Sequence, residues 1–242
     1  MIIGSKIQAA CKSMRKKAAA ISGGRKGQRR RDNMENIPED GQEMTGSVEE
    51  KIPDQIKDEE KCPEMKLVFS DRAYASILAE TAEKIRTETG GLFLGAVEDN
   101  VWYVTEVIDP GPDSVFEVAY FEYDQAYTRH LINKVANIYD ARLDLIGLWH
   151  RHPGSFDIFS GTDDGTNIKY AAMRPEGAVS MLVNIDPLLR FTVYHVDRRC
   201  GYTRIPYEVG TNKIPEKYLK LKTPERFEQI MRVRIKQHGA AY

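Results

Sequence analysis

Hydrophobic positions between residues 66 and 209 follow two different spacings along the chain. Short runs rich in Val, Ile, Leu and aromatic residues, separated by Gly, Pro or Asn, are typical of strands. Apolar residues repeated every three or four positions are typical of helices. The predicted strands cover residues 67–69, 90–97, 101–109, 114–119, 143–150, 178–186 and 190–197, and the predicted helices cover 70–88, 123–140 and 161–174.

This mixture of elements predicts one domain over residues 66–209, of the α/β (α+β mixed sheet) class, with helices around a mixed β-sheet. Ser70 or Asp71 is a suitable cap for the first helix. A C-terminal extension, residues 210–242, contains a further amphipathic helix that Thr223 can cap. Its apolar face either packs back onto the domain or binds a partner, and the pattern leaves both alternatives open.

Charge sets residues 1–65 apart from the rest of the chain. Residues 1–31 contain ten Lys or Arg and no acid, whereas residues 32–65 contain twelve acids and three Lys. Such charged blocks with few aromatics predict a disordered or conditionally ordered leader. It is either a solvated tail or a basic arm for a membrane surface, nucleic acid or a partner. The acidic part is also a candidate inhibitory arm.

The remaining composition narrows the class of protein. Residues 66–242 carry 22 basic and 24 acidic groups, which predicts no specific nucleic-acid binding. No apolar run approaches the roughly 18 to 20 residues of a transmembrane segment, and the N-terminus lacks the apolar centre of a secretory signal. Three widely separated cysteines favour a reducing compartment, so a cytoplasmic location is expected.

The stretch GLWHRHPGSFDIFSGTDDGTN, residues 147–167, carries the candidate chemistry. If the predicted strand runs to its histidines, His150 and His152 leave the same face and reach one ion, while Arg151 points away. Asp163, at the start of the predicted third helix, is the expected third ligand, with Asp164 in reserve. Nitrogen and carboxylate ligands suit Zn²⁺, and three of them leave one position for water.

Two further groups are candidates for catalysis. Glu88, at the end of the first predicted helix and followed by Gly90 and Gly91, is the candidate general base for a metal-activated water. Ser160, three residues before Asp163, is the candidate donor to an oxyanion.

Each of these residues also has a purely structural interpretation. SGTD, residues 160–163, is typical of a helix capping box. An isolated HxH in a strand is more often a surface or core pair, and a glutamate before Gly-Gly usually marks a helix end. His130 and His195, in a predicted helix and a late strand, are not expected to be ligands. The combined spacing of the candidate residues favours the functional interpretation.

HRHPGSFDIFSGTD and ETGGLFLG resemble the signature of the JAB/MPN (JAMM) metalloproteases over about residues 66–200. The resemblance implies a cytidine-deaminase-like JAB/MPN fold with a zinc held by His150, His152 and Asp163. It also implies Glu88 as the base and Ser160 as the oxyanion donor. No Cys/His cluster follows Asp163, so the chain looks like the compact prokaryotic type. Arg151 replaces a residue that is more often small and hydroxylated, and we expect it to be available to the substrate.

The implied activity is hydrolysis of an isopeptide or peptide bond after the C-terminal glycines of ubiquitin or a ubiquitin-like modifier. The implied partners are that modifier or its conjugate, together with enzymes of the activating and conjugating (E1/E2-like) type. Two alternatives remain open. One is a noncatalytic MPN scaffold module, and the other is a metallohydrolase that processes small peptides or sulfur-carrier proteins.

Overall fold

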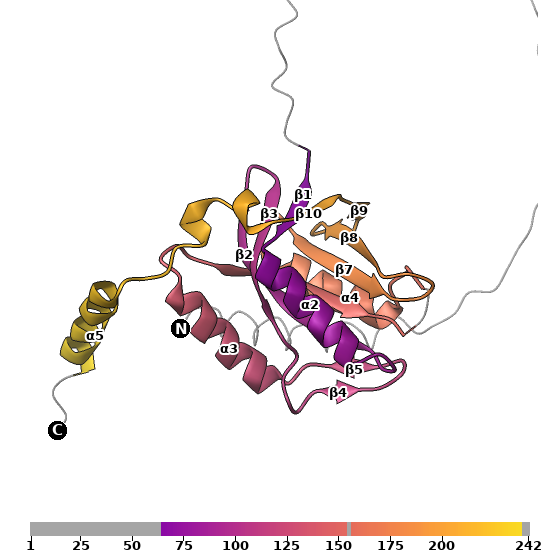
Figure 1. Cartoon of the computed structure of the whole chain (residues 1–242), viewed down its shortest axis with the longest axis horizontal. Coiled ribbons are helices and arrows are strands. Elements are labelled where there is room, and N and C mark those ends of the chain that lie inside the picture. Colours follow the sequence, from indigo (N-terminus) through magenta and orange to yellow (C-terminus); the bar gives the residue numbers. More distant parts are fainter. Residues whose placement is uncertain (1–63, 154–155, 239–242) are drawn as a thin grey trace, which may run out of the picture. The chain divides into compact units, whose positions relative to one another are not determined.

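The structure, a computed structural model, describes residues 64–153 and 156–238 (Figure 1). The predictions for the leader therefore lie outside the described residues. The main strands are β1 (Lys66–Phe69), β2 (Thr89–Glu98), β3 (Val101–Ile108), β6 (Asp144–Arg151), β7 (Ala178–Asn184), β8 (Arg190–Val196), β9 (Tyr202–Arg204) and β10 (Tyr207–Val209). The helices are α2 (Asp71–Glu83), α3 (Gln125–Ile138), α4 (Gly161–Ala171) and α5 (Pro224–His238), with short 3₁₀ turns η2 (Thr211–Lys213) and η3 (Glu216–Tyr218).

Within the described residues, eight strands form one sheet in the order β10-β1-β3-β2-β6-β7-β8-β9. Strand β2 lies at its centre and runs antiparallel to both β3 and β6, whereas β6 runs parallel to β7 and β1 parallel to β3. This mixed sheet, flanked by helices, confirms the predicted fold class. The sheet begins at Lys66 and its last strand ends at Val209, while the proposed division of the whole chain into three parts stays a prediction.

The helices cover the two faces of the sheet, with α2 across the front and α4 behind in Figure 1. Ala73 and Ile77 of α2 pack on one face in the largest apolar cluster, together with Trp149 of β6. Helix α3 inserts Ile132 into a second cluster that includes Leu148, which points the opposite way from Trp149 because strand side chains alternate.

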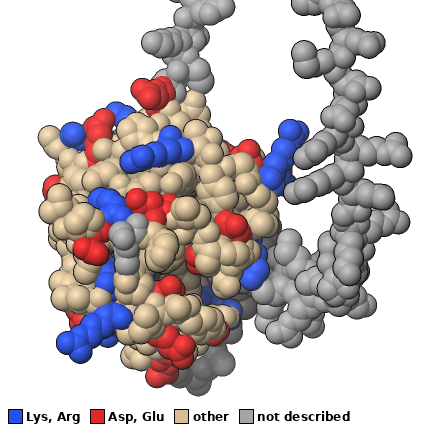
Figure 2. Space-filling view, turned by 90° about the vertical axis from the view of Figure 1, so that its right-hand side faces the viewer, with Lys and Arg blue, Asp and Glu red and all other residues tan. Residues whose placement is uncertain are grey.

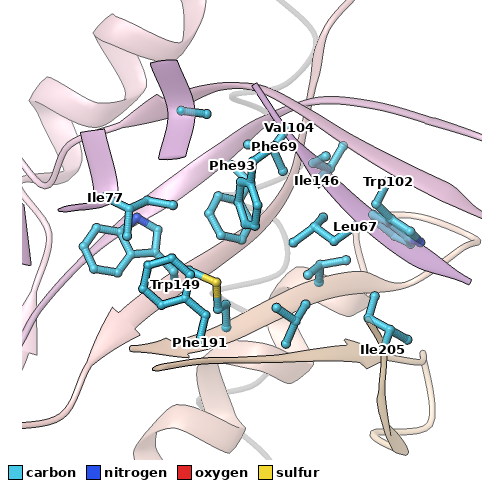
Figure 3. Close-up of a cluster of buried hydrophobic side chains, with 14 of the residues drawn as sticks. Leu67, Phe69, Ile77, Phe93, Trp102, Val104, Ile146, Trp149, Phe191 and Ile205 are labelled. Atoms are coloured by element: carbon cyan, nitrogen blue, oxygen red, sulfur yellow. The ribbon is translucent and has the colours of Figure 1, made fainter. Parts of the chain in front are cut away.

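Aromatic rings and branched side chains fill the space between α2 and the sheet (Figure 3). Phe69 and Phe93 meet edge to face with ring centroids 5.5 Å apart. Both side chains are fully buried, as are Ile77 and Trp149. This packing holds α2 against the central strands of the sheet.

Three local predictions can be compared with the structure. Ser70 caps α2 as predicted, because its hydroxyl accepts from the Ala73 amide at 3.0 Å. The helix ends at Glu83 rather than at 88, and residues 84–87 form a turn. Of the predicted strand 114–119, only Val115–Phe116 is a strand (β4), and it pairs in a short hairpin with β5 (Phe121–Glu122).

Helix α5 is amphipathic, as the sequence predicts, and the Arg226 amide donates to the Thr223 hydroxyl at 3.3 Å. Its apolar face is not packed onto the domain, since Met231 is 53% and Ile235 66% exposed. Of the two alternatives for this helix, packing back onto the domain is therefore wrong for the described residues.

Lys and Arg are interspersed with Asp and Glu on the face shown in Figure 2, with uncharged surface between them. No helix in the described part of the chain is long and apolar enough to cross a membrane.

Replacing Ile77 by Ala tests how strongly α2 contributes to the core. The change removes a fully buried side chain and should lower the free energy of unfolding by about 2–5 kcal/mol, measured by urea denaturation. Ile235→Ala, at an exposed helix position, is the matched control and should change it by no more than about 0.5 kcal/mol. Equal effects of the two substitutions would contradict the packing described here.

Candidate metal centre

The two histidines lie at the end of β6, a strand that is buried between β2 and β7. Because alternate residues leave a strand on opposite faces, His150 and His152 point to the same side of the sheet. Their side chains are buried and their Nε2 atoms lie 2.8 Å apart. The His152 ring is further oriented through Nδ1, which lies 3.2 Å from the Phe156 carbonyl oxygen.

Asp163 reaches the same point from the first turn of α4. Its Oδ2 atom lies 3.4 Å from His150 Nε2 and 3.5 Å from His152 Nε2. Ser160 caps this helix: its hydroxyl accepts from the Asp163 amide at 3.3 Å, and its own amide donates to Asp163 Oδ2 at 2.7 Å. The capping box therefore fixes the carboxylate beside the two imidazoles.

The separations among these three donor atoms suit a single small cation. Ligand atoms about 2.0–2.1 Å from a tetrahedral Zn²⁺ lie about 3.3–3.4 Å apart. Two of the three observed separations match this value, and the third, between the imidazoles, is about 0.5 Å shorter. His150, His152 and Asp163 are thus positioned to bind a metal, and their nitrogen and oxygen donors fit zinc.

The three groups also shift one another's protonation. Burial alone would raise the pKa of Asp163, but hydrogen bonds and charge from His150 and His152 hold it well below its usual range. Burial acts to lower the pKa of His152, yet the hydrogen bond and charge of Asp163 outweigh burial and raise it. Asp163 is therefore held in its ionised form beside the two imidazoles, the form in which a carboxylate binds a metal.

Glu88 belongs to the same site, although it does not lie at a helix end as predicted. It directly precedes β2, and it shares a face with Gly90, the residue paired with His150. Glu88 lines a cavity of about 470 Å³ together with His150, His152 and Asp163. Burial raises the pKa of the Glu88 carboxyl, while the nearby histidines act to lower it.

The two glycines after Glu88 allow β2 and β6 to approach closely. A Cβ atom on Gly90 would lie 2.5 Å from the Trp149 carbonyl oxygen and 2.8 Å from the Phe121 ring. One on Gly91 would lie 2.5 Å from the Trp149 indole nitrogen. Larger residues at these positions would force the strands apart and move Glu88 away from the histidines.

The remaining candidate residues do not join the metal group. Asp164 accepts a hydrogen bond from the Tyr202 hydroxyl at 2.7 Å, so the reserve ligand is engaged elsewhere. Of the two histidines set aside from the sequence, His130 is exposed on α3, and His195 contacts the Glu176 carbonyl oxygen from β8. Arg151 does point away from the histidines, but it is only 1% exposed, so the expectation that it is available to the substrate is wrong.

Asn167 lines the cavity and was missed in the sequence. It is buried one helical turn after Asp163, and its Nδ2 donates to the Tyr202 hydroxyl at 3.0 Å. The spacing of four residues on a predicted helix, which places two side chains on one face, was the available signal.

Apolar side chains form the outer walls of the cavity. Val118 and Tyr120 come from the β4–β5 hairpin, and Phe156 and Ile158 come from the loop between β6 and α4. Val118 is 67%, Phe156 75% and Ile158 77% exposed. Exposed apolar residues gathered around a polar centre are typical of a binding groove.

The fold and the site together define a mixed α/β domain with a two-histidine, one-aspartate metal-binding group. Residues 70–189 match the family described as prokaryotic homologues of the JAB domain, which confirms the resemblance found in the sequence. Among solved structures, the chain is similar to the solution structure of a protein from Desulfitobacterium hafniense, with 14% identity and a TM-score of 0.46 over 59% of this chain and 92% of that chain. No curated protein matches the sequence.

Titration of the metal-free protein with Zn²⁺ tests the site. The unchanged chain should bind one ion, and Asp163→Asn should weaken binding by about 10²-fold or more because it removes a charged ligand. Asp164→Asn is the matched control and should leave the affinity unchanged, since Asp164 is bonded to Tyr202. Isothermal titration calorimetry measures both. The opposite ranking would assign the metal to Asp164.

Proposed function

We propose that this protein is a zinc-dependent isopeptidase or peptidase that cleaves the bond after the C-terminal glycines of a ubiquitin-like modifier. The match to the JAB family supports a function of the JAB/MPN type. One observation carries the proposal furthest: the half-buried Glu88 carboxylate opens into the same cavity as the three metal-ligand side chains. A site built only for metal storage or structure does not need such a base.

His150, His152 and Asp163 would hold the ion, which when bound supplies positive charge and a water molecule acidified toward neutral pH. The Glu88 carboxylate would accept a proton from the attacking water and deliver it to the leaving amine as the bond between the carbonyl carbon and that amine breaks. Burial suits Glu88 to this role, because a raised pKa makes its carboxylate a stronger base.

Ser160 is the proposed donor to the negative charge that develops on the carbonyl oxygen. Its hydroxyl accepts a hydrogen bond from the Asp163 amide, which leaves its own proton available for donation into the cavity. The capping role and the catalytic role are therefore compatible in one side chain.

The shape of the cavity supports an extended substrate. The β4–β5 hairpin and the loop before α4 both contribute apolar walls to the cavity. The Glu88 amide donates a hydrogen bond to the Glu117 carbonyl oxygen of the hairpin at 2.7 Å. We expect an extended tail to add to this hairpin as a strand, with glycines at the positions nearest the metal-ligand side chains. The proposed partners are the modifier or its conjugates and the activating and conjugating enzymes that attach it.

The decisive experiment compares two kinds of substrate. Full-length protein loaded with zinc is incubated with ubiquitin-like proteins fused through a terminal Gly-Gly, and separately with short peptides. Cleavage of the fusions supports the proposal. Cleavage of peptides alone would make the protein a small-peptide hydrolase, and binding without cleavage of either would make it a scaffold module.

Glu88→Gln should retain zinc and lower kcat by about 10²–10⁴-fold, because it removes a general base but no metal ligand. Zinc content by elemental analysis and steady-state cleavage of the fusion measure the two effects. Glu117→Gln is the control: only the backbone carbonyl of Glu117 contacts Glu88, so activity should be unchanged. Full activity of Glu88→Gln would remove Glu88 from the mechanism.

Ser160→Ala should have two separate effects. The loss of the helix cap should lower the free energy of unfolding by about 1 kcal/mol, and the loss of the oxyanion donor should lower kcat by about 10²–10³-fold with zinc retained. Ser160→Thr keeps the hydroxyl and should restore most of both properties. If alanine reduces stability but leaves kcat intact, Ser160 is a cap only.

A further inference from the structure

Arg151 is an unusual residue to find between two metal-ligand histidines. It is one of the largest fully buried side chains in the described structure, with 1% of its surface exposed. It leaves β6 on the side opposite His150 and His152, toward α2. Within the described residues it forms no ion pair with an acidic side chain, and burial lowers the pKa of its guanidinium group. A charge buried in this way requires another form of compensation.

The compensation comes from main-chain oxygens of the turn that follows α2. Arg151 Nη1 donates to the carbonyl oxygens of Lys84 and Thr87, the latter at 2.6 Å, and Nη2 donates to that of Ile85. Carbonyl groups at a helix C-terminus lack partners within the helix and carry partial negative charge. The planar guanidinium, with several fixed donors, can satisfy three of them at once.

The turn held by Arg151 leads directly into Glu88. Thr87, which accepts one of the hydrogen bonds, is the preceding residue, and Thr89, the following one, is paired with Arg151 in the β2–β6 register. The Glu88 carboxylate itself makes no hydrogen bond or ion pair within the described structure, although it feels the charges of the histidines. Its position is therefore set by the backbone on either side of it.

We infer that Arg151 is a positioning residue that fixes the turn 84–87 and so holds Glu88 at the metal centre. Strand β6 thus contributes to the site from both faces of the sheet. His150 and His152 would bind the ion on one face, and Arg151 on the other face anchors the turn that leads to Glu88. This inference rests on the proposed function for its catalytic consequence. Its structural part, the anchoring of the turn, is independent of any activity.

The test uses Arg151→Lys in the full chain, which keeps the positive charge but loses the fork of donors. Arg142→Lys, at an exposed arginine paired with Asp144, is the matched control. In the metal-free protein, hydrogen exchange of amides 85–89 should become faster by about tenfold in Arg151→Lys, with exchange in α4 and β7 unchanged. The control should behave as the parent chain. Unchanged exchange at 85–89 would overturn the anchoring role.

The catalytic consequence has its own readouts. Arg151→Lys should retain one zinc and a similar KM, while kcat falls by about 10²-fold, the effect of a misplacement near 1 Å. In a Glu88→Gln background the same substitution should cause little further loss, because its effect acts through Glu88. An independent, multiplicative loss, or loss of the metal, would contradict the positioning role. Arg151→Met serves as a second variant if the lysine protein does not fold.

These outcomes separate the two proposals. If the parent chain hydrolyses nothing but exchange at 85–89 still increases in Arg151→Lys, the proposed function fails and the anchoring of the turn stands. If the parent is active and Arg151→Lys has the exchange and the kcat of the parent, the proposed function stands and the inference about Arg151 fails.

Discussion

The site depends on the antiparallel pairing of β2 with β6. In this register Gly90 lies opposite His150 and Thr89 opposite Arg151. Paired residues share a face of a sheet, so a single alignment of two strands places Glu88 on the side of the imidazoles and the turn before it within reach of the guanidinium. A shift by one residue would exchange the faces of the sheet and separate Glu88 from the two histidines. The glycines permit the close approach, because any side chain at Gly90 would collide with the Trp149 carbonyl.

The carboxylates beside this pair of strands are positioned by the ends of two helices. The first turn of α4 contributes Asp163, oriented by the capping box with Ser160, and the turn after α2 leads to Glu88. Main-chain groups that lack partners at helix ends carry partial charge. The capping box pairs such groups at the start of α4, and Arg151 pairs them after the end of α2. Hydrogen bonds from the histidines keep the pKa of Asp163 far below its usual range, whereas burial raises that of Glu88. Two carboxylates in one cavity thus have opposite pKa shifts, which suits the different roles proposed for them, one as a ligand and one as a base.

Local pattern predicted most of the elements and failed where tertiary contacts decide. Ile85 continues the helical spacing, yet α2 ends at Glu83, because the carbonyl groups of the turn are bonded to Arg151, which lies 64–67 positions further along the chain. The run at 114–119 has strand composition, but its strand stops at Phe116, which pairs with Phe121 in a short hairpin. The apolar face of α5 has the pattern of a packed helix, although Met231 and Ile235 are exposed.

The sequence by itself determined the mixed class of the fold, the identity of His150, His152 and Asp163 as a convergent group, and the cap at Ser160. These follow from the two-residue period of strands, the start signal of a helix, and the donor chemistry of the side chains, all of which are local. Only the tertiary structure decided that Glu88 shares their cavity, that Arg151 is buried behind it, and that Asn167 completes the wall. The reason is physical: these relations depend on strand register and on which main-chain groups lack partners after folding, and neither is encoded in any short segment.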